Sequence, residues 1–179
     1  RINYPKGIVV NPSLFTDNIN YPNKEDVVYL LGKDYVILRQ DFHNSRRQQI
    51  RKEVSNILIT MGGSDAHNIT PLLIDKIVKV EKDVTFHVIL GKGTNINKEY
   101  YNSNFFNINF YENLSSEKIC ELMLKCDLAI TAAGQTIYEL LATNTPFIPI
   151  QTAENQKNNI DGLMKYGLMQ DIISVHDPL

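Results

Sequence analysis

The chain has 179 residues, with 18 lysines and arginines against 20 aspartates and glutamates, and 43% of its residues are hydrophobic. This length and apolar content are sufficient for one folded domain with a substantial core. A formal net charge of −2 argues against a nucleic-acid partner, because proteins that bind nucleic acid usually have a basic excess or a basic face. No apolar run approaches the roughly 18 residues that a membrane span requires.

The cysteines and the first residues bear on the cellular compartment. Cys120 and Cys126 lie six positions apart, which is neither a zinc-binding nor a redox-active spacing. Residues 1–5 lead into no apolar segment of the kind that a secretory signal peptide contains. The sequence therefore predicts a cytoplasmic protein with reduced thiols packed against a helix, and no disulfide framework.

Residues 1–50 show no regular alternation of elements. They contain a strand-like segment at 7–11, a turn-rich middle and a second apolar stretch at 27–38. The polar segment 41–52 is expected to be a short surface helix or a connector. We interpret residues 1–50 as the trailing segment of a missing N-terminal domain plus a connector, and residues 51–179 as a domain of their own.

From residue 54 onward, strands and helices alternate. Short β-rich runs predict strands at 54–61, 84–90, 105–111, 127–131, 146–150 and 171–175. Apolar periodicity and capping residues predict helices at 70–78, 115–125, 135–143 and 155–166, with Thr70 and Ser115 as N-caps. This alternation is typical of βαβ units. The sequence therefore predicts an α/β fold, a doubly wound Rossmann-like domain with a parallel sheet covered on both faces.

Ligands of such sheets bind at the loops that follow the carboxyl ends of the strands, and the first of three unusual loops is Gly62-Gly63-Ser64-Asp65. Two glycines let the backbone come close to a ligand, while Ser64 and Asp65 offer acceptors and caps. The loop lacks the lysine of a P-loop and the Gly-x-Gly-x-x-Gly spacing, so a triphosphate or dinucleotide site is not supported. A tight turn before a capped helix explains the same residues. Gly91-Lys92-Gly93 forms a weaker loop of the same kind.

The second loop follows the strand at 127–131. Its small residues would let an anion reach the free amides at the start of the next helix, where the helix dipole also favours negative charge. The residues concerned are Ala133, Gly134, Gln135 and Thr136. Glu139 lies about one turn further on the same helix face and could accept hydrogen bonds from the vicinal hydroxyls of a ribose. The alternative is that Glu139 is a solvated helix glutamate.

The third loop follows the strand at 146–150. Its polar side chains, Glu154, Asn155 and Gln156, cluster at the expected start of a helix. Amides and carboxylates together can recognise sugar hydroxyls or an acyl amide, which need paired donors and acceptors. An ordinary polar turn with an N-cap is the alternative.

The four histidines are weak candidates for catalysis. His87 falls within a predicted buried strand, His43 within the connector, His67 after the glycine turn and His176 in the tail. No His, Cys, Asp or Glu cluster has a metal-ligand spacing, and no Gly-x-Ser-x-Gly motif is present. The sequence thus identifies no catalytic residue, and we expect neither a metal nor a cofactor.

The order of the three loops resembles the C-terminal half of a GT-B nucleotide-sugar protein. The motifs that carry the resemblance are Ile57–Asp65, Cys126–Leu140, Pro146–Ile150 and Glu154–Gln156, and the similarity extends over about residues 30–173. They are most similar to the UDP-sugar hydrolases of pseudaminic acid biosynthesis and their relatives in spore coat polysaccharide biosynthesis. The peptidoglycan N-acetylglucosaminyltransferases are more distantly similar.

The resemblance implies a UDP or UDP-sugar partner and a role for each loop. Ala133, Gly134 and Gln135 would meet the diphosphate through backbone amides, and Glu139 would bind the ribose. Gly91 and the segment 111–114 would border the uracil, and the Gly62-Gly63 loop would approach the phosphates. Glu154, Asn155 and Gln156 would contact the sugar.

The resemblance also implies a reaction in which water attacks the sugar C1 and UDP leaves. The base expected for that step is a histidine in the N-terminal domain, whose matching loop is missing from this sequence. We therefore expect this chain alone to bind a uridine nucleotide without turnover. The donor-binding half of a UDP-GlcNAc-type glycosyltransferase and a noncatalytic nucleotide-sugar-binding module remain open as alternatives. An NAD-dependent enzyme is disfavoured because the dinucleotide motif is absent.

Overall fold

The computed structural model describes residues 4–79 and 83–174. The chain divides into two compact units, of which the larger contains Leu38–Thr152 and the residues from Ile173 on. The smaller contains the residues up to Ile37 together with Ala153–Ile172. This division differs from the predicted boundary near residue 50, because the segment 38–50 belongs with the larger unit.

The larger unit is built on a five-stranded parallel sheet. Its strands are β3 (Asn56–Thr60), β4 (Thr85–Ile89), β5 (Ile108–Tyr111), β6 (Leu128–Ala132) and β7 (Phe147–Ile150). Their spatial order is β5-β4-β3-β6-β7, and every neighbouring pair is parallel. From β3 in the centre of the sheet, the chain proceeds through β4 to the edge strand β5. It then returns to β6, beside β3, and proceeds to β7 at the other edge, so the direction of winding reverses between β3 and β6.

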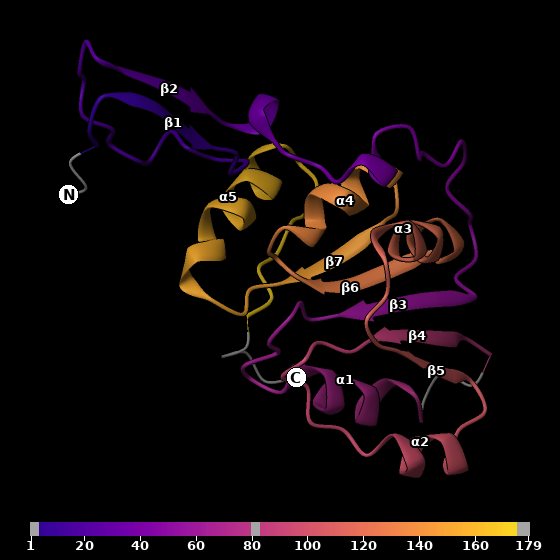
Figure 1. Ribbon diagram of the computed structural model, residues 1–179. Helices are drawn as coiled ribbons and strands as arrows, with labels where there is room; N and C mark the ends of the chain where they lie inside the picture. Colours follow the sequence, from indigo (N-terminus) through magenta and orange to yellow (C-terminus); the bar gives the residue numbers. More distant parts are fainter. Residues whose placement is uncertain (1–3, 80–82, 175–179) are drawn as a thin grey trace. The chain divides into compact units, whose positions relative to one another are not determined.

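Helices cover both faces of this sheet. They are α1 (Ile69–Ile77), α2 (Lys98–Asn104), α3 (Ser116–Lys125) and α4 (Thr136–Thr143). Figure 1 shows α1 and α2 on one side of the sheet, with α3 and α4 on the other. Successive residues of a strand point to opposite faces of the sheet: Ile59 lies in the core with α1, whereas Leu58 lies in the core with α3. The predicted doubly wound α/β fold is thus confirmed.

Local signals explain where most helices begin. The Ser115 hydroxyl accepts a hydrogen bond from the Lys118 amide at 3.3 Å, which confirms the predicted cap of α3. The predicted cap Thr70 is wrong, because the helix begins at Ile69 and Thr70 lies within its first turn. The Asp65 carboxylate instead accepts from the amides of Ile69 at 2.8 Å and Thr70 at 3.1 Å. Asp65 was predicted to offer such a cap.

Two other elements differ from the predictions. Helix α2 was not predicted, although the side chain of Asn97 caps it by accepting from the Tyr100 amide. No strand forms at 171–174, where a single parallel bridge joins Ser174 to Gln151; Val175 lies outside the described residues.

The segment 41–52 is an integral part of the larger unit, in contrast to the short surface helix or connector that the sequence predicted. Phe42, in the 3-10 turn Gln40–Phe42, is only 1% exposed and packs with α3 and α4. The Arg47 guanidinium donates to the carbonyls of Met123, Leu124 and Cys126, which satisfies groups that the end of α3 leaves unpaired. Arg51 forms an ion pair with Asp127. The segment therefore closes the carboxyl end of α3.

The smaller unit contains a two-stranded parallel sheet and one helix. Strands β1 (Gly7–Asn11) and β2 (Val27–Leu31) pair in register, and α5 (Lys157–Lys165) follows the 3-10 turn Glu154–Gln156. A further 3-10 turn spans Lys33–Tyr35. Gly162 lets α5 lie close to Leu14, because a Cβ atom on Gly162 would stand 2.3 Å from the Leu14 Cβ. The unit thus joins residues from the first part of the sequence to the segment Ala153–Ile172 in one compact body.

Candidate functional site

The reversal of winding between β3 and β6 defines the place where a ligand is expected to bind. These strands are adjacent and parallel, with Thr60 paired with Thr131 at their carboxyl ends. The loops that follow them therefore leave the same edge of the sheet side by side. Open α/β sheets bind ligands outside the strand ends at such a switch point. The structure thus brings together the first and second of the three loops that the sequence singled out.

The β3–α1 loop turns sharply at its glycines. Gly62 has a φ of 79°, a conformation that side-chain-bearing residues rarely adopt. Gly63 and Ser64 follow it at exposed positions, and a Cβ atom on Gly63 would meet nothing within 4 Å. This loop therefore leaves open space for a ligand beside its backbone.

Gly91 and Gly93 have a structural role that the sequence did not reveal. A Cβ atom on Gly91 would stand 2.3 Å from the Gly62 carbonyl oxygen, and one on Gly93 would stand 2.2 Å from the Ser64 carbonyl oxygen. The Gly93 amide also lies within hydrogen-bond distance, 3.4 Å, of the Gly63 carbonyl. The loop after β4 thus supports the loop after β3 by direct backbone contact.

The β6–α4 loop presents backbone amides at the other side of the switch point. The Ala133 amide donates to the Ile150 carbonyl at 2.9 Å, so it extends the β6–β7 pairing. Within residues 4–79 and 83–174, the amides of Gly134 and Thr136 donate to no protein acceptor. Gly134 and Thr136 are half-buried and Gln135 is exposed. The amides that can meet an anion at the start of α4 are therefore those of Thr136, its first residue, and of Gly134, which precedes the N-cap Gln135.

Glu139 lies one turn into α4 and is not the solvated glutamate of the alternative interpretation. Its side chain is 8% exposed, and its Oε1 accepts from the Arg39 Nε at 2.8 Å. The Arg39 guanidinium carbon lies 5.0 Å from the centre of the Phe42 ring. Sequence reasoning missed Arg39, because nothing local to it indicates a partner 100 positions away.

The third loop lies in the other compact unit. Glu154, Asn155 and Gln156 form the 3-10 turn that precedes α5, so they do stand at a helix start. Glu154 and Asn155 are exposed, and Gln156 is half-buried. Their proposed contact with a sugar stays a prediction.

The histidines in the described part of the chain lie as the sequence predicted. His87 is 1% exposed within β4, and its ring nitrogens lie 2.9 Å from the Tyr111 hydroxyl and 3.0 Å from the Asn56 Oδ1. Burial lowers the pKa of His87 to about 4, so the ring is neutral at pH 7. His43 and His67 are exposed, and His176 lies outside the described residues.

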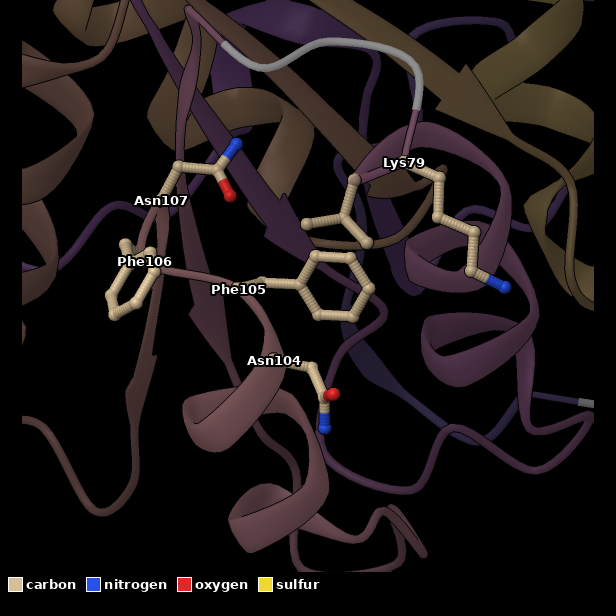
Figure 2. Close-up of a pocket in the computed structure, with 6 residues that line it drawn as sticks. Lys79, Asn104, Phe105, Phe106 and Asn107 are labelled. Carbon is tan, nitrogen blue, oxygen red and sulfur yellow. The ribbon is translucent and has the colours of Figure 1, made fainter.

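A pocket of about 350 Å³ lies elsewhere, beside residues 104–107 at the amino end of β5 (Figure 2). Phe106 is fully exposed there, while the Phe105 ring points towards the end of α1. The pocket thus lies at the amino ends of the strands, whereas the glycine loops follow their carboxyl ends. Over residues 4–79 and 83–174, no group of three or more His, Cys, Asp or Glu side chains is placed to hold a metal ion. No helix in the same ranges has the length and hydropathy to cross a membrane.

Comparison with known proteins supports the fold and identifies two relatives by sequence. No family model matches the chain. It is 31% identical over 172 residues to the uncharacterized protein MJ1062 of Methanocaldococcus jannaschii, covering 88% of this chain and 35% of that protein. It is also 31% identical over 154 residues to the pseudaminic acid cytidylyltransferase and UDP-2,4-diacetamido-2,4,6-trideoxy-beta-L-altropyranose hydrolase of Helicobacter pylori, covering 86% of this chain and 28% of that protein. The chain spans about a third of the length of these relatives.

A solved structure has the same fold. The glycotransferase of kitacinnamycin superposes on 95% of this chain and 41% of its own, with a TM-score of 0.61 and 13% sequence identity. At this identity the match concerns the fold alone. The larger unit, with its five-stranded parallel sheet alternating with helices, therefore has the fold of a GT-B glycosyltransferase domain, as the resemblance in the sequence implied.

Proposed function

We propose that this chain is the UDP-sugar-binding domain of a nucleotide-sugar hydrolase in the biosynthesis of surface polysaccharides or nonulosonic acids. The observation that carries the proposal is that two loops of small residues follow the adjacent strands β3 and β6 and so lie side by side at the switch point. The similarity to a Helicobacter pylori protein whose name includes a UDP-sugar hydrolase supports the substrate class.

The diphosphate would lie at the start of α4. The amides of Gly134 and Thr136 have no other partner in the described ranges, and the helix dipole adds favourable charge there. Because the Ala133 amide already donates to Ile150, we assign Ala133 a packing role and the exposed Gln135 a place beside the phosphates. Gly62, Gly63 and Ser64 would approach the same phosphates from the neighbouring loop, with Gly91 holding that loop in place.

The ribose would bind to Glu139, whose carboxylate lies one turn beyond those amides. Carboxylates accept two hydrogen bonds side by side, which suits vicinal hydroxyls. Glu154, Asn155 and Gln156 would recognise the sugar. This assignment follows the family resemblance.

The reaction would be attack of water on the sugar C1 with UDP as the leaving group. Amides that stabilise the developing charge on the departing diphosphate would lower its barrier. The general base is expected in an N-terminal domain, as the family resemblance implies. His87 is buried, His43 lies outside the glycine loops, and His67, although exposed in the β3–α1 loop, occupies no matching catalytic motif. One face of the β1–β2 sheet exposes Ile8, Val10 and Val28, and parallel sheets are normally covered on both faces. We propose that this face packs within that domain.

The donor-binding half of a glycosyltransferase is the second candidate. The fold match to a glycotransferase favours it, and stabilising a departing UDP serves transfer to a sugar hydroxyl as well as transfer to water. Incubation of a protein that contains the upstream domain with UDP-N-acetylated sugars distinguishes the two. Release of UDP and free sugar without an acceptor supports hydrolysis, whereas a strict need for an acceptor supports transfer.

Thermal unfolding of the 179-residue chain with UDP, UMP and NAD tests the ligand class. At a concentration a hundred times its Kd, a ligand adds about 2.7 kcal/mol to the free energy of unfolding, which raises the Tm by several degrees. We expect UDP to raise the Tm more than UMP at equal concentration, and NAD to leave it unchanged. Stabilisation by NAD without stabilisation by UDP would overturn the proposal.

A further inference from the structure

The ion pair between Arg39 and Glu139 ties two distant parts of the larger unit together. The Arg39 Nε donates to the Glu139 Oε1 at 2.8 Å, and the Glu139 side chain is only 8% exposed. A carboxylate taken out of water without a partner is costly, so a nearby guanidinium is the expected compensation. The pair also brings a residue from the segment before β3 to the helix that follows the candidate phosphate loop.

The neighbouring Phe42 orients Arg39, whose own side chain is 43% exposed. Its guanidinium lies 5.0 Å from the centre of the Phe42 ring, and Phe42 is 1% exposed among residues of α3 and α4. The Phe42 amide donates to the Arg39 carbonyl at 3.0 Å. The Asp41 carboxylate, in the same turn, accepts from the hydroxyl of Ser116 on α3. Arg39 is therefore presented to Glu139 by a turn that is anchored on two sides.

The carboxylate of Glu139 keeps acceptor capacity for a ligand. An ionised carboxylate has two oxygens with about four lone-pair sites, and Arg39 uses one of them on Oε1. Across the described ranges 4–79 and 83–174, Oε2 accepts no hydrogen bond. A cis-diol, which has two adjacent O–H donors, would fill that capacity. A carboxylate held at one oxygen cannot rotate freely, so its other lone pairs keep fixed directions.

We propose that Arg39 is a positioning residue that sets the preference of this site for ribose, by fixing the orientation of the Glu139 carboxylate for the 2′- and 3′-hydroxyls. The inference rests on the proposed function, because it requires a uridine nucleotide at the β3–β6 switch point. It adds that discrimination between a ribonucleotide and a 2′-deoxyribonucleotide depends on a residue that itself touches no hydroxyl.

Calorimetric titration of UDP and 2′-deoxy-UDP into the chain and its Arg39 variants tests this inference. We expect the wild-type chain to bind UDP at least about tenfold more tightly than 2′-deoxy-UDP, since a hydrogen bond to a charged group carries that discrimination. Arg39→Met keeps an unbranched apolar stem and removes the guanidinium, so the preference should fall to below about threefold. Arg39→Lys restores a cation and should recover part of the preference. Arg46→Met, at an exposed position, is the matched control.

The outcomes separate the inference from the proposed function. Absence of UDP binding by the wild-type chain overturns both. Binding of UDP without preference over 2′-deoxy-UDP overturns the inference and leaves the proposed function standing. An unchanged preference in Arg39→Met, or an equal loss of affinity for both nucleotides, assigns Arg39 a purely structural role and also overturns the inference. If the melting profile shows that Arg39→Met does not fold, Arg39→Lys decides. A preference for UDP smaller than that of the wild-type chain supports the inference, whereas a preference equal to that of the wild-type chain overturns it.

Discussion

At the scale of single residues, the structure changes the meaning of Glu139 more than that of any other candidate. The spacing from Gln135 predicted the helix face on which Glu139 lies. It could not predict that Glu139 is buried beside Arg39, because the two residues are 100 positions apart in the sequence. A buried carboxylate with one fixed partner is a more selective acceptor than a solvated one, because its remaining lone pairs have fixed directions. The residue is therefore a stronger candidate for hydroxyl recognition than the sequence alone indicated.

Replacement of Glu139 tests its contact with the ribose. Glu139→Gln keeps the shape of the side chain but loses its charge, so we expect the affinity for UDP to fall about tenfold or more, from a lost charge-assisted hydrogen bond of about 1.5–3 kcal/mol. Isothermal calorimetry measures the change. Glu121→Gln, at an exposed position on α3, serves as control. Equal affinities of Glu139→Gln and Glu121→Gln would remove Glu139 from the site.

His87 gives a residue-scale prediction about pH. Its pKa is lowered to about 4 by burial, whereas an unfolded histidine has a pKa of 6.5. Since the folded chain binds the proton less readily than the unfolded chain, its stability is complete above pH 6.5 and decreases as the pH falls towards 4. The decrease should reach about 3 kcal/mol, as a shift of one pKa unit is worth about 1.4 kcal/mol.

Urea unfolding at pH 7.5, 5.5 and 4.5 measures this dependence. The His87→Gln variant, which has no titrating ring, should lose less stability over this range than the wild-type chain. His67→Gln, at an exposed position, should behave like the wild type. Parallel curves for the wild-type chain and His87→Gln would show that His87 does not carry the effect.

At the scale of elements, the sequence located the strands of the large sheet to within one to three residues. Buried β-rich runs bounded by turn residues are strong local signals, and helices after them are implied by the parallel sheet. Helix α2 was missed although Asn97 caps it, because a seven-residue helix has little periodicity. The prediction of a surface helix or connector at 41–52 was wrong because Arg47 and Arg51 donate to carbonyls more than 70 positions away, which local sequence does not indicate.

Arg47 provides the element-scale prediction for that segment. Its guanidinium closes the end of α3 through several carbonyls, so Arg47→Ala removes their hydrogen bonds to a charged group, although the Met123 carbonyl keeps the Thr145 hydroxyl as a donor. We expect a loss of about 2–4 kcal/mol in the free energy of unfolding, as buried groups lose hydrogen bonds to a charge. Chemical denaturation compares this variant with Arg46→Ala, whose side chain is exposed. Similar losses in the two variants would contradict the assigned role.

The contact between the loops after β3 and β4 gives a second element-scale prediction. In Gly91→Ala the new Cβ atom would stand 2.3 Å from the Gly62 carbonyl oxygen, so one of the two backbones must move. Overpacking of this kind costs about 1–3 kcal/mol, which should appear as a lower Tm. Gly63→Ala, whose Cβ atom would meet nothing within 4 Å, should change the Tm little. A Tm of Gly91→Ala equal to that of Gly63→Ala would exclude a tight contact between these loops.

At the scale of the whole molecule, the sequence predicted the fold class. It also singled out three loops, and two of them lie at the switch point of the sheet. It could not predict the division of the chain, in which Ala153–Ile172 joins the unit of the N-terminal residues. Gly162 and Leu14 lie 148 positions apart, and only the folded structure shows that a side chain on Gly162 would collide with Leu14. Long-range contacts of this kind do not affect the local periodicity of the sequence, so they cannot be predicted from it.

The central claim is that a uridine diphosphate binds where the loops after β3 and β6 meet. Titration of the ¹⁵N-labelled chain with UDP, followed through its amide resonances, tests this claim most directly. We expect saturable shifts that are largest for Gly134, Thr136 and the Gly62–Ser64 loop. Shifts confined to the opposite edge, around Phe105 and Phe106, or a spectrum that UDP leaves unchanged, would contradict it.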